Sequence, residues 1–112
     1  MRPLNDYERR LMGRLVEQGL SPSAIASSGS DVQGEDIAPE DKAWHHIRLR
    51  YDENPWKGGG YAIIADWSAR DLDGGLITLL VLGDHEGRPY EIEIQRPDLQ
   101  PIQHLPAVGT WA

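Results

Sequence analysis

The chain has 112 residues and a formal net charge of −7 from 18 acidic and 11 basic residues, so it fits one domain with a single core and should repel nucleic acid. It contains no cysteine, which excludes disulfides and thiolate metal sites and is typical of a reducing compartment. Because its longest apolar run, residues 76–82, is too short to cross a bilayer and no signal peptide is recognisable, we expect a cytoplasmic protein without a membrane partner.

An amphipathic helix is predicted over residues 6–18. Asn5 can cap its first turn while Glu8, three residues later, reaches back to the cap, which is the capping-box pattern. Leu11 and Leu15 lie on an apolar half of the helical wheel, and arginines occupy the other half. The helix should therefore lie on a core.

A long loop is predicted over residues 21–43, because this stretch is rich in Ser, Gly, Pro and acids and lacks apolar periodicity. Five acids lie between Asp31 and Asp41, with no base among them. An alternative is a helix-turn-helix that uses residues 23–28 as its second helix. That helix would be short, serine-rich and followed by acids, which makes it a poor reader of a phosphate-lined groove. We therefore prefer a mobile loop.

Four strands and a tail are predicted after this loop: 44–51, 61–68, 75–83 and 89–96, then the tail over 97–112. The first strand alternates a basic outer row with an apolar inner row. The next two are apolar on both faces, which predicts a central place in the sheet. The Asp-Gly pair at residues 73–74 predicts a hairpin. We therefore expect a single α+β domain, residues 1–112, in which the helix packs on a four-stranded antiparallel β-meander.

The predicted core consists of branched aliphatic side chains from the helix and three of the strands. They are Leu11, Leu15, Ile63, Ile64, Ile77, Leu79, Val81, Ile92 and Ile94.

Several stretches resemble the motifs of a family of short uncharacterised bacterial proteins. The start RPLNDYERRL is similar to that family's RPLT(D/E)xER start, and DLDG at residues 71–74 is similar to its DxDG motif. The stretch YEIEIQRPD, residues 90–98, is similar to its ELEIyRxD motif. The pairs PI at 101–102 and LP at 105–106 complete the pattern.

This resemblance covers about residues 2–20 and 66–106. The chain departs from the family pattern at residues 98–100, where DLQ replaces Asp-Gly, and at residues 82–83, where the family often has a His. The resemblance implies a fold and a domain of unknown function. It carries no catalytic residues across.

Glu91 and Glu93 lie on the same side of the last predicted strand, with backbones about 6.6 Å apart. That spacing would allow the carboxylate pair of a glycoside hydrolase. Such a pair needs one buried and one solvated acid, and no neighbour in the sequence distinguishes the two. We therefore assign both to the exposed face of a half-buried strand, and we expect no catalytic residue.

Metal binding is not expected either. His45 and His46 are adjacent on a strand and point to opposite faces, and DLDG lacks the further ligands of a calcium loop. A site that combined a histidine with Asp71 or Asp73 would need convergence of distant segments. We therefore expect neither a metal nor another cofactor.

Two functions fit these observations. The first is a non-catalytic acidic binding protein, such as an immunity or antitoxin-like inhibitor, whose protein partner has a basic surface. Its expected contact residues are Glu91, Glu93, Asp71, Asp73, Glu35 and Asp36.

The alternative is a small enzyme or ligand-binding domain with a pocket between sheet and helix, and we favour the first function over it. This pocket would use His46 or Asp66 beside Trp44, Trp56 or Trp67. A flat charged sheet face would favour the first function. A concave pocket that holds a titratable group with a perturbed pKa would favour the alternative.

Overall fold

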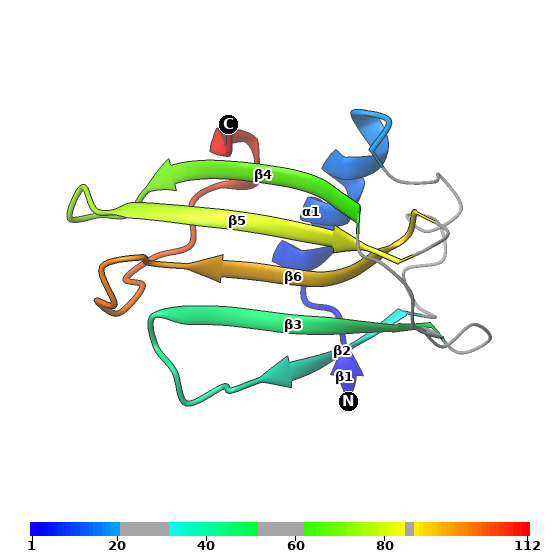
Figure 1. Cartoon of the computed structure of the whole chain (residues 1–112), viewed down its shortest axis with the longest axis horizontal. Coiled ribbons are helices and arrows are strands. Elements are labelled where there is room, and N and C mark those ends of the chain that lie inside the picture. The colour runs from blue at the N-terminus through cyan, green and yellow to red at the C-terminus, as the bar shows by residue number, and fades with distance from the viewer. Residues whose placement is uncertain (21–31, 52–61, 85–86) are drawn as a thin grey trace.

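The structure, a computed structural model, describes residues 1–20, 32–51, 62–84 and 87–112. In these ranges it is α+β, with one N-terminal α-helix and a six-stranded antiparallel sheet of order β1-β2-β3-β6-β5-β4 (Figure 1). The elements in chain order are β1 (Arg2–Pro3), α1 (Asp6–Glu17), β2 (Val32–Ile37), β3 (Trp44–Tyr51), β4 (Ala62–Arg70), β5 (Leu76–Gly83), β6 (Pro89–Gln95) and the 3-10 helix η1 (Val108–Thr110). The α+β class is confirmed, but the prediction of four strands is wrong.

Two strands that the sequence did not predict, β1 and β2, extend the sheet beyond β3. The loop prediction over 21–43 is therefore wrong for β2, and its part over residues 21–31 lies outside the described residues. The inner face of β2 carries a buried Val32 and a Gly34 that packs under the side chain of Leu4. With so little apolar surface, β2 lacks the alternation that identifies a half-buried strand.

The predicted meander order is wrong as well, because β3 pairs with β6 and not with β4. In this register Arg48 lies opposite Glu91, and opposite charges on neighbouring strands stabilise the pairing. Strand β4 lies at the edge of the sheet and not at its centre, although its sequence is apolar on both faces.

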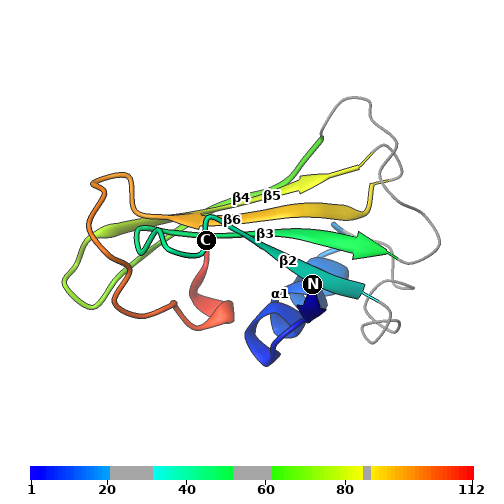
Figure 2. The same cartoon turned by 90° about the horizontal axis from the view of Figure 1, so that it is seen from below.

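The core lies between α1 and one face of the sheet (Figure 2). Among the predicted core residues, the buried ones are Leu11, Leu15, Ile77, Leu79, Val81, Ile92 and Ile94. Ile64 is half-buried, and Ile63 is 66% exposed, so the prediction for Ile63 is wrong. The reason is a β-bulge between Ile63 and Ala65, which turns Ile63 to the outer face.

The capping box of α1 is confirmed. The Asn5 side chain accepts a hydrogen bond from the Glu8 N–H (2.8 Å), and the Glu8 carboxylate accepts one from the Asn5 N–H (2.9 Å). The helix ends at Glu17, and Gly19 then adopts the left-handed conformation with φ of 72°.

The C-terminal segment lies on the same side of the sheet as α1 (Figure 2) and also reaches the edge strand β4. Trp111 is buried, and its Nε1–H donates a hydrogen bond to the Tyr7 hydroxyl (2.8 Å). Ala112 exchanges two backbone hydrogen bonds with Ser68 of β4 (2.9 and 3.1 Å). The tail therefore fastens the helix and the sheet edge together.

Candidate functional site

The DLDG and RPD motifs meet in a buried ionic cluster beside the β4–β5 turn. Arg96, which directly follows β6, is 3% exposed. Its guanidinium lies 3.1 Å from the carboxylate of Asp71, 2.9 Å from that of Asp73 and 2.6 Å from that of Asp98. A Cβ atom on Gly75 would clash with this guanidinium, so a larger residue there would displace Arg96 from its present position.

Asp71 also joins the hairpin to the tail. Its carboxylate accepts hydrogen bonds from the backbone N–H groups of Leu72, Gln103 and His104. Burial by itself would raise the pKa of Asp71. The hydrogen bonds from these N–H groups and from Arg96 outweigh burial and lower the pKa to about 2. Asp71 therefore stays ionised and holds the tail in place.

A second ionic cluster is built by the RPLNDYER motif. Arg2 forms two hydrogen bonds with each of two carboxylates, at 2.7 Å to Glu8 and at 2.9 Å to Asp36. The Nε2 atom of His45 lies 3.4 Å from Glu8. Burial by itself would raise the pKa of Glu8. Hydrogen bonds from Arg2, His45 and the Asn5 N–H outweigh burial and lower the pKa to about 2. This cluster attaches the start of α1 to β2 and β3.

The acids expected to contact a partner do not form one row. Asp71 and Asp73 lie beside Arg96, Asp36 lies beside Arg2, and the others lie on the helix-free face of the sheet: Glu35, Glu91 and Glu93. Five of these six acids form an ion pair with an arginine, which leaves Glu93 without one among the described residues.

The register expected for β6 is confirmed, because Ile92 and Ile94 are buried in the core while Glu91 and Glu93 turn to the other face. The exposure expected for Glu91 is wrong. Glu91 is 7% exposed, because Arg48 of the neighbouring strand covers it and donates hydrogen bonds of 3.0 and 3.1 Å to its Oε1 atom. Glu93 is half-buried.

His46 lies beside these two carboxylates, in a grouping that sequence reasoning missed. It is directly opposite Glu93 in the β3–β6 pairing, and its Nε2 atom is 3.5 Å from Glu91 Oε2. The Trp44 ring stacks on the His46 ring at 4.6 Å between centroids. Among the described residues, His46, Glu91 and Glu93 are the group that could share a metal ion, with ligand atoms within 4.8 Å of one another. The β3–β6 pairing, which the sequence did not predict, brings them together.

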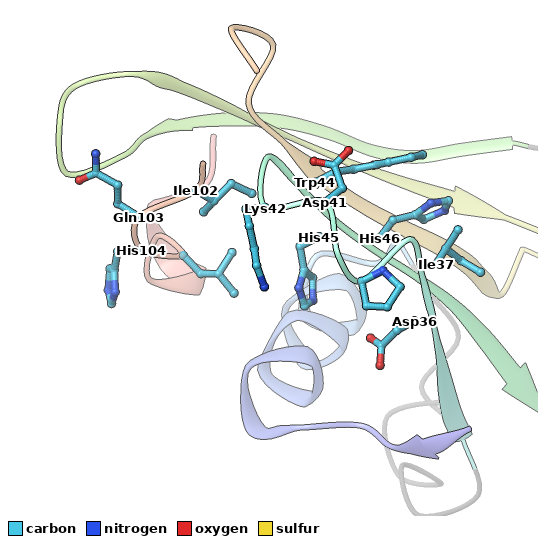
Figure 3. Close-up of a pocket in the computed structure, with 12 residues that line it drawn as sticks. Asp36, Ile37, Asp41, Lys42, Trp44, His45, His46, Ile102, Gln103 and His104 are labelled. Atoms are coloured by element: carbon cyan, nitrogen blue, oxygen red, sulfur yellow. The ribbon is translucent and has the colours of Figure 1, made fainter. Parts of the chain in front are cut away.

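A cavity of about 630 Å³ lies at the end of the sheet where β2 leads into β3 (Figure 3). Figure 3 shows His45 beside α1, whereas Trp44 and His46 lie on the other face of β3. The side chains that line this cavity include Lys42, His104 and Asp36. Hydrogen bonds from Arg2 lower the pKa of Asp36.

The residues expected to line the pocket of the alternative function do not all meet at this cavity. Trp44 and His46 line this cavity, whereas Asp66 and Trp67 are not among its lining residues. Asp66 is exposed on β4, and Trp67 packs against Arg14 at 4.1 Å. Trp56 lies outside the described residues.

The sequence matches a domain of unknown function, DUF6984, over residues 1–106. The chain belongs to this family. No curated protein and no solved structure matches it. The family resemblance expected from the motifs is therefore confirmed, and the match also spans the middle of the chain, where no resemblance was recognised.

The motifs of this DUF6984 domain build its two ionic clusters. The start motif supplies Arg2 and Glu8, and the later motifs supply Asp71, Asp73 and Arg96. These residues hold turns and termini together, which explains their spacing without a catalytic role. His46 and Trp44 lie outside the motif stretches. Within the described part of the chain, no helix is long and apolar enough to span a membrane.

Proposed function

We propose that this DUF6984 domain is a non-catalytic binding protein that presents the helix-free face of its sheet to a protein partner with a basic surface. The supporting observation is a row of outward side chains in register across five strands: Ile37, His46, Glu93, Leu80 and Asp66. Among the described residues, Glu93 and Asp66 have no ion-pair partner, and they flank Leu80. Ile63 and Leu76 on the same face are 66% and 40% exposed.

This arrangement fits a partner that places Lys or Arg side chains beside an apolar patch. The other acids of this face, Glu35 and Glu91, are already paired with arginines. A partner's cations would therefore meet Glu93 and Asp66, while the net charge of −7 adds long-range attraction. An immunity or antitoxin-like inhibitor of a toxin with a basic surface would have these properties.

The cavity at the β2–β3 connection supports ligand binding as a second candidate. Its volume lies within the range of small-molecule sites. Lys42 and His104 line this cavity and are exposed, so variants there distinguish a cavity from the sheet face.

The double variant Asp66→Asn/Glu93→Gln tests the proposed face. Purified proteins encoded by the neighbouring genes serve as candidate partners, and association rates are measured by surface plasmon resonance. For a cationic partner we expect association to slow about tenfold at low ionic strength and the defect to shrink at about 0.5 M salt. Melting curves confirm that both proteins remain folded.

The matched control is Asp6→Asn/Glu17→Gln, which makes the same two chemical changes at exposed positions of α1. It removes the same net charge and should slow association less than about twofold. Equal defects in the two double variants would show that net charge alone acts, which contradicts the proposed face. Loss of binding only in Lys42→Ala/His104→Ala would assign recognition to the cavity.

A further inference from the structure

We propose that His46, Glu91 and Glu93 bind a divalent first-row transition metal, with Zn²⁺ as the best match. The first observation is a buried imidazole without a hydrogen-bond partner among the described residues. His46 is 8% exposed, and neither of its ring nitrogens has a hydrogen-bond partner among the described residues. Buried polar groups are rarely left unsatisfied, because the loss of water is then uncompensated. A metal ion would supply the partner that this imidazole lacks.

The second observation is that two carboxylates converge on the same ring. His46 Nε2 is 3.5 Å from Glu91 Oε2, close enough for an ion pair, although no hydrogen bond joins the two atoms. Glu93 lies directly across from His46, and the ligand atoms of all three residues are within 4.8 Å of one another. These side chains share the outer face of β3 and β6, so one ion could reach all three.

The net charge of this group and its neighbour Arg48 is favourable for binding a cation. Arg48 donates both of its hydrogen bonds to Glu91 Oε1, so Oε2 keeps its lone pairs. Glu93 has no ion-pair partner among the described residues. With a neutral imidazole, the two glutamates and Arg48 together carry one net negative charge.

Apolar side chains flank the group along the sheet, and an aromatic ring holds the imidazole in place. The Trp44 ring stacks on that of His46 with an angle of 24° between the ring planes. The side chains in register on either side are Ile37 on β2 and Leu80 and Leu82 on β5. An apolar shell strengthens the attraction between carboxylates and a cation.

One imidazole and two carboxylates are ligands of Zn²⁺ and of Mn²⁺ or Fe²⁺, whereas Ca²⁺ and Mg²⁺ prefer oxygen ligands alone. Ligand atoms in a tetrahedral zinc site lie roughly 3.4 Å apart. The glutamate side chains would therefore rotate inward on binding. Three protein ligands leave one position for water or for an external ligand.

The test is isothermal titration of the tag-free, chelator-treated full chain with ZnCl₂, with MnCl₂, and with MgCl₂ and CaCl₂ as comparison ions. We expect one Zn²⁺ per chain and binding of Mg²⁺ and Ca²⁺ at least about tenfold weaker. His46→Ala and Glu93→Gln should each weaken Zn²⁺ binding at least about tenfold. Glu93→Gln is the second variant because half-buried Glu93 can be changed with little effect on folding.

The matched control is His104→Ala, which removes an exposed histidine and should leave Zn²⁺ affinity unchanged. Zn²⁺ binding that persists in both His46→Ala and Glu93→Gln would overturn the site, as would tighter binding of Ca²⁺ than of Zn²⁺. Metal binding is measured without any partner protein. A bound metal would take up the charge that Glu93 offers on the proposed face, so association rates are measured on chelator-treated protein and the two proposals can fail separately.

Discussion

Replacement of Arg96 by methionine is expected to lower the melting temperature by at least about 10 °C. The reason is that Arg96 supplies the cation for three carboxylates, one of which, Asp71, is fully buried. Methionine fills similar volume but leaves that carboxylate without a counter-charge and frees Asp98 and the tail. Thermal unfolding followed by circular dichroism measures the effect.

Arg70→Met is the matched control, because Arg70 is an exposed arginine beside the same β4–β5 turn. Its contact in that turn is one long hydrogen bond to the Gly74 carbonyl oxygen, at 3.4 Å. We expect its melting temperature to stay within about 2 °C of the parent value. A similarly small change in Arg96→Met would show that the cluster contributes little to folding.

Replacement of Glu8 by glutamine should lower the free energy of unfolding by about 3 kcal/mol at neutral pH. This value follows from the pKa of Glu8, which is lowered from 4.5 to about 2 in the folded chain. Its ionised carboxylate is thus stabilised by folding, through Arg2 above all, and the amide of glutamine cannot replace that charge. Urea unfolding of the two proteins gives the difference.

The pH dependence of this difference identifies its cause. Because folding lowers the pKa of Glu8, its contribution is complete above about pH 4.5 and is lost as the pH falls through about 2. The difference in the free energy of unfolding between the parent protein and Glu8→Gln should therefore shrink by about half near pH 3. Glu17→Gln, which changes an exposed glutamate of the same helix, should show no such gap. A gap that does not change with pH would assign the effect to packing or to the cap.

Local patterns in the sequence were sufficient to place α1 and four of the strands. The capping box fixed the start of the helix, and the period of two fixed β3 at residues 44–51. Features that depend on distant residues were not predictable in this way. Strand β2 has Gly34 at a position where an apolar core side chain would indicate a strand. The β-bulge before Ala65 turns Ile63 to the outer face of the sheet.

The candidate site depends on which strands are neighbours, so local patterns could not reveal it. Glu91 is buried, and His46 meets Glu93, because β3 pairs with β6. One signal could have indicated this pairing. The outer row of β3 is basic, with Arg48 and Arg50, and that of β6 is acidic, so complementary charge favours these two strands as neighbours.

The tail that pairs with β4 also bears on self-association. Edge strands offer unpaired backbone groups to other chains, and β4 is the edge strand at this end of the sheet. Ala112 occupies the backbone groups of Ser68 on that edge, while Trp111 anchors the tail in the core. The family match ends at residue 106, so a chain cut there would lose both the pairing of Ala112 with Ser68 and the buried Trp111. We therefore expect a chain without residues 107–112 to associate through the β4 edge more readily than the full chain does.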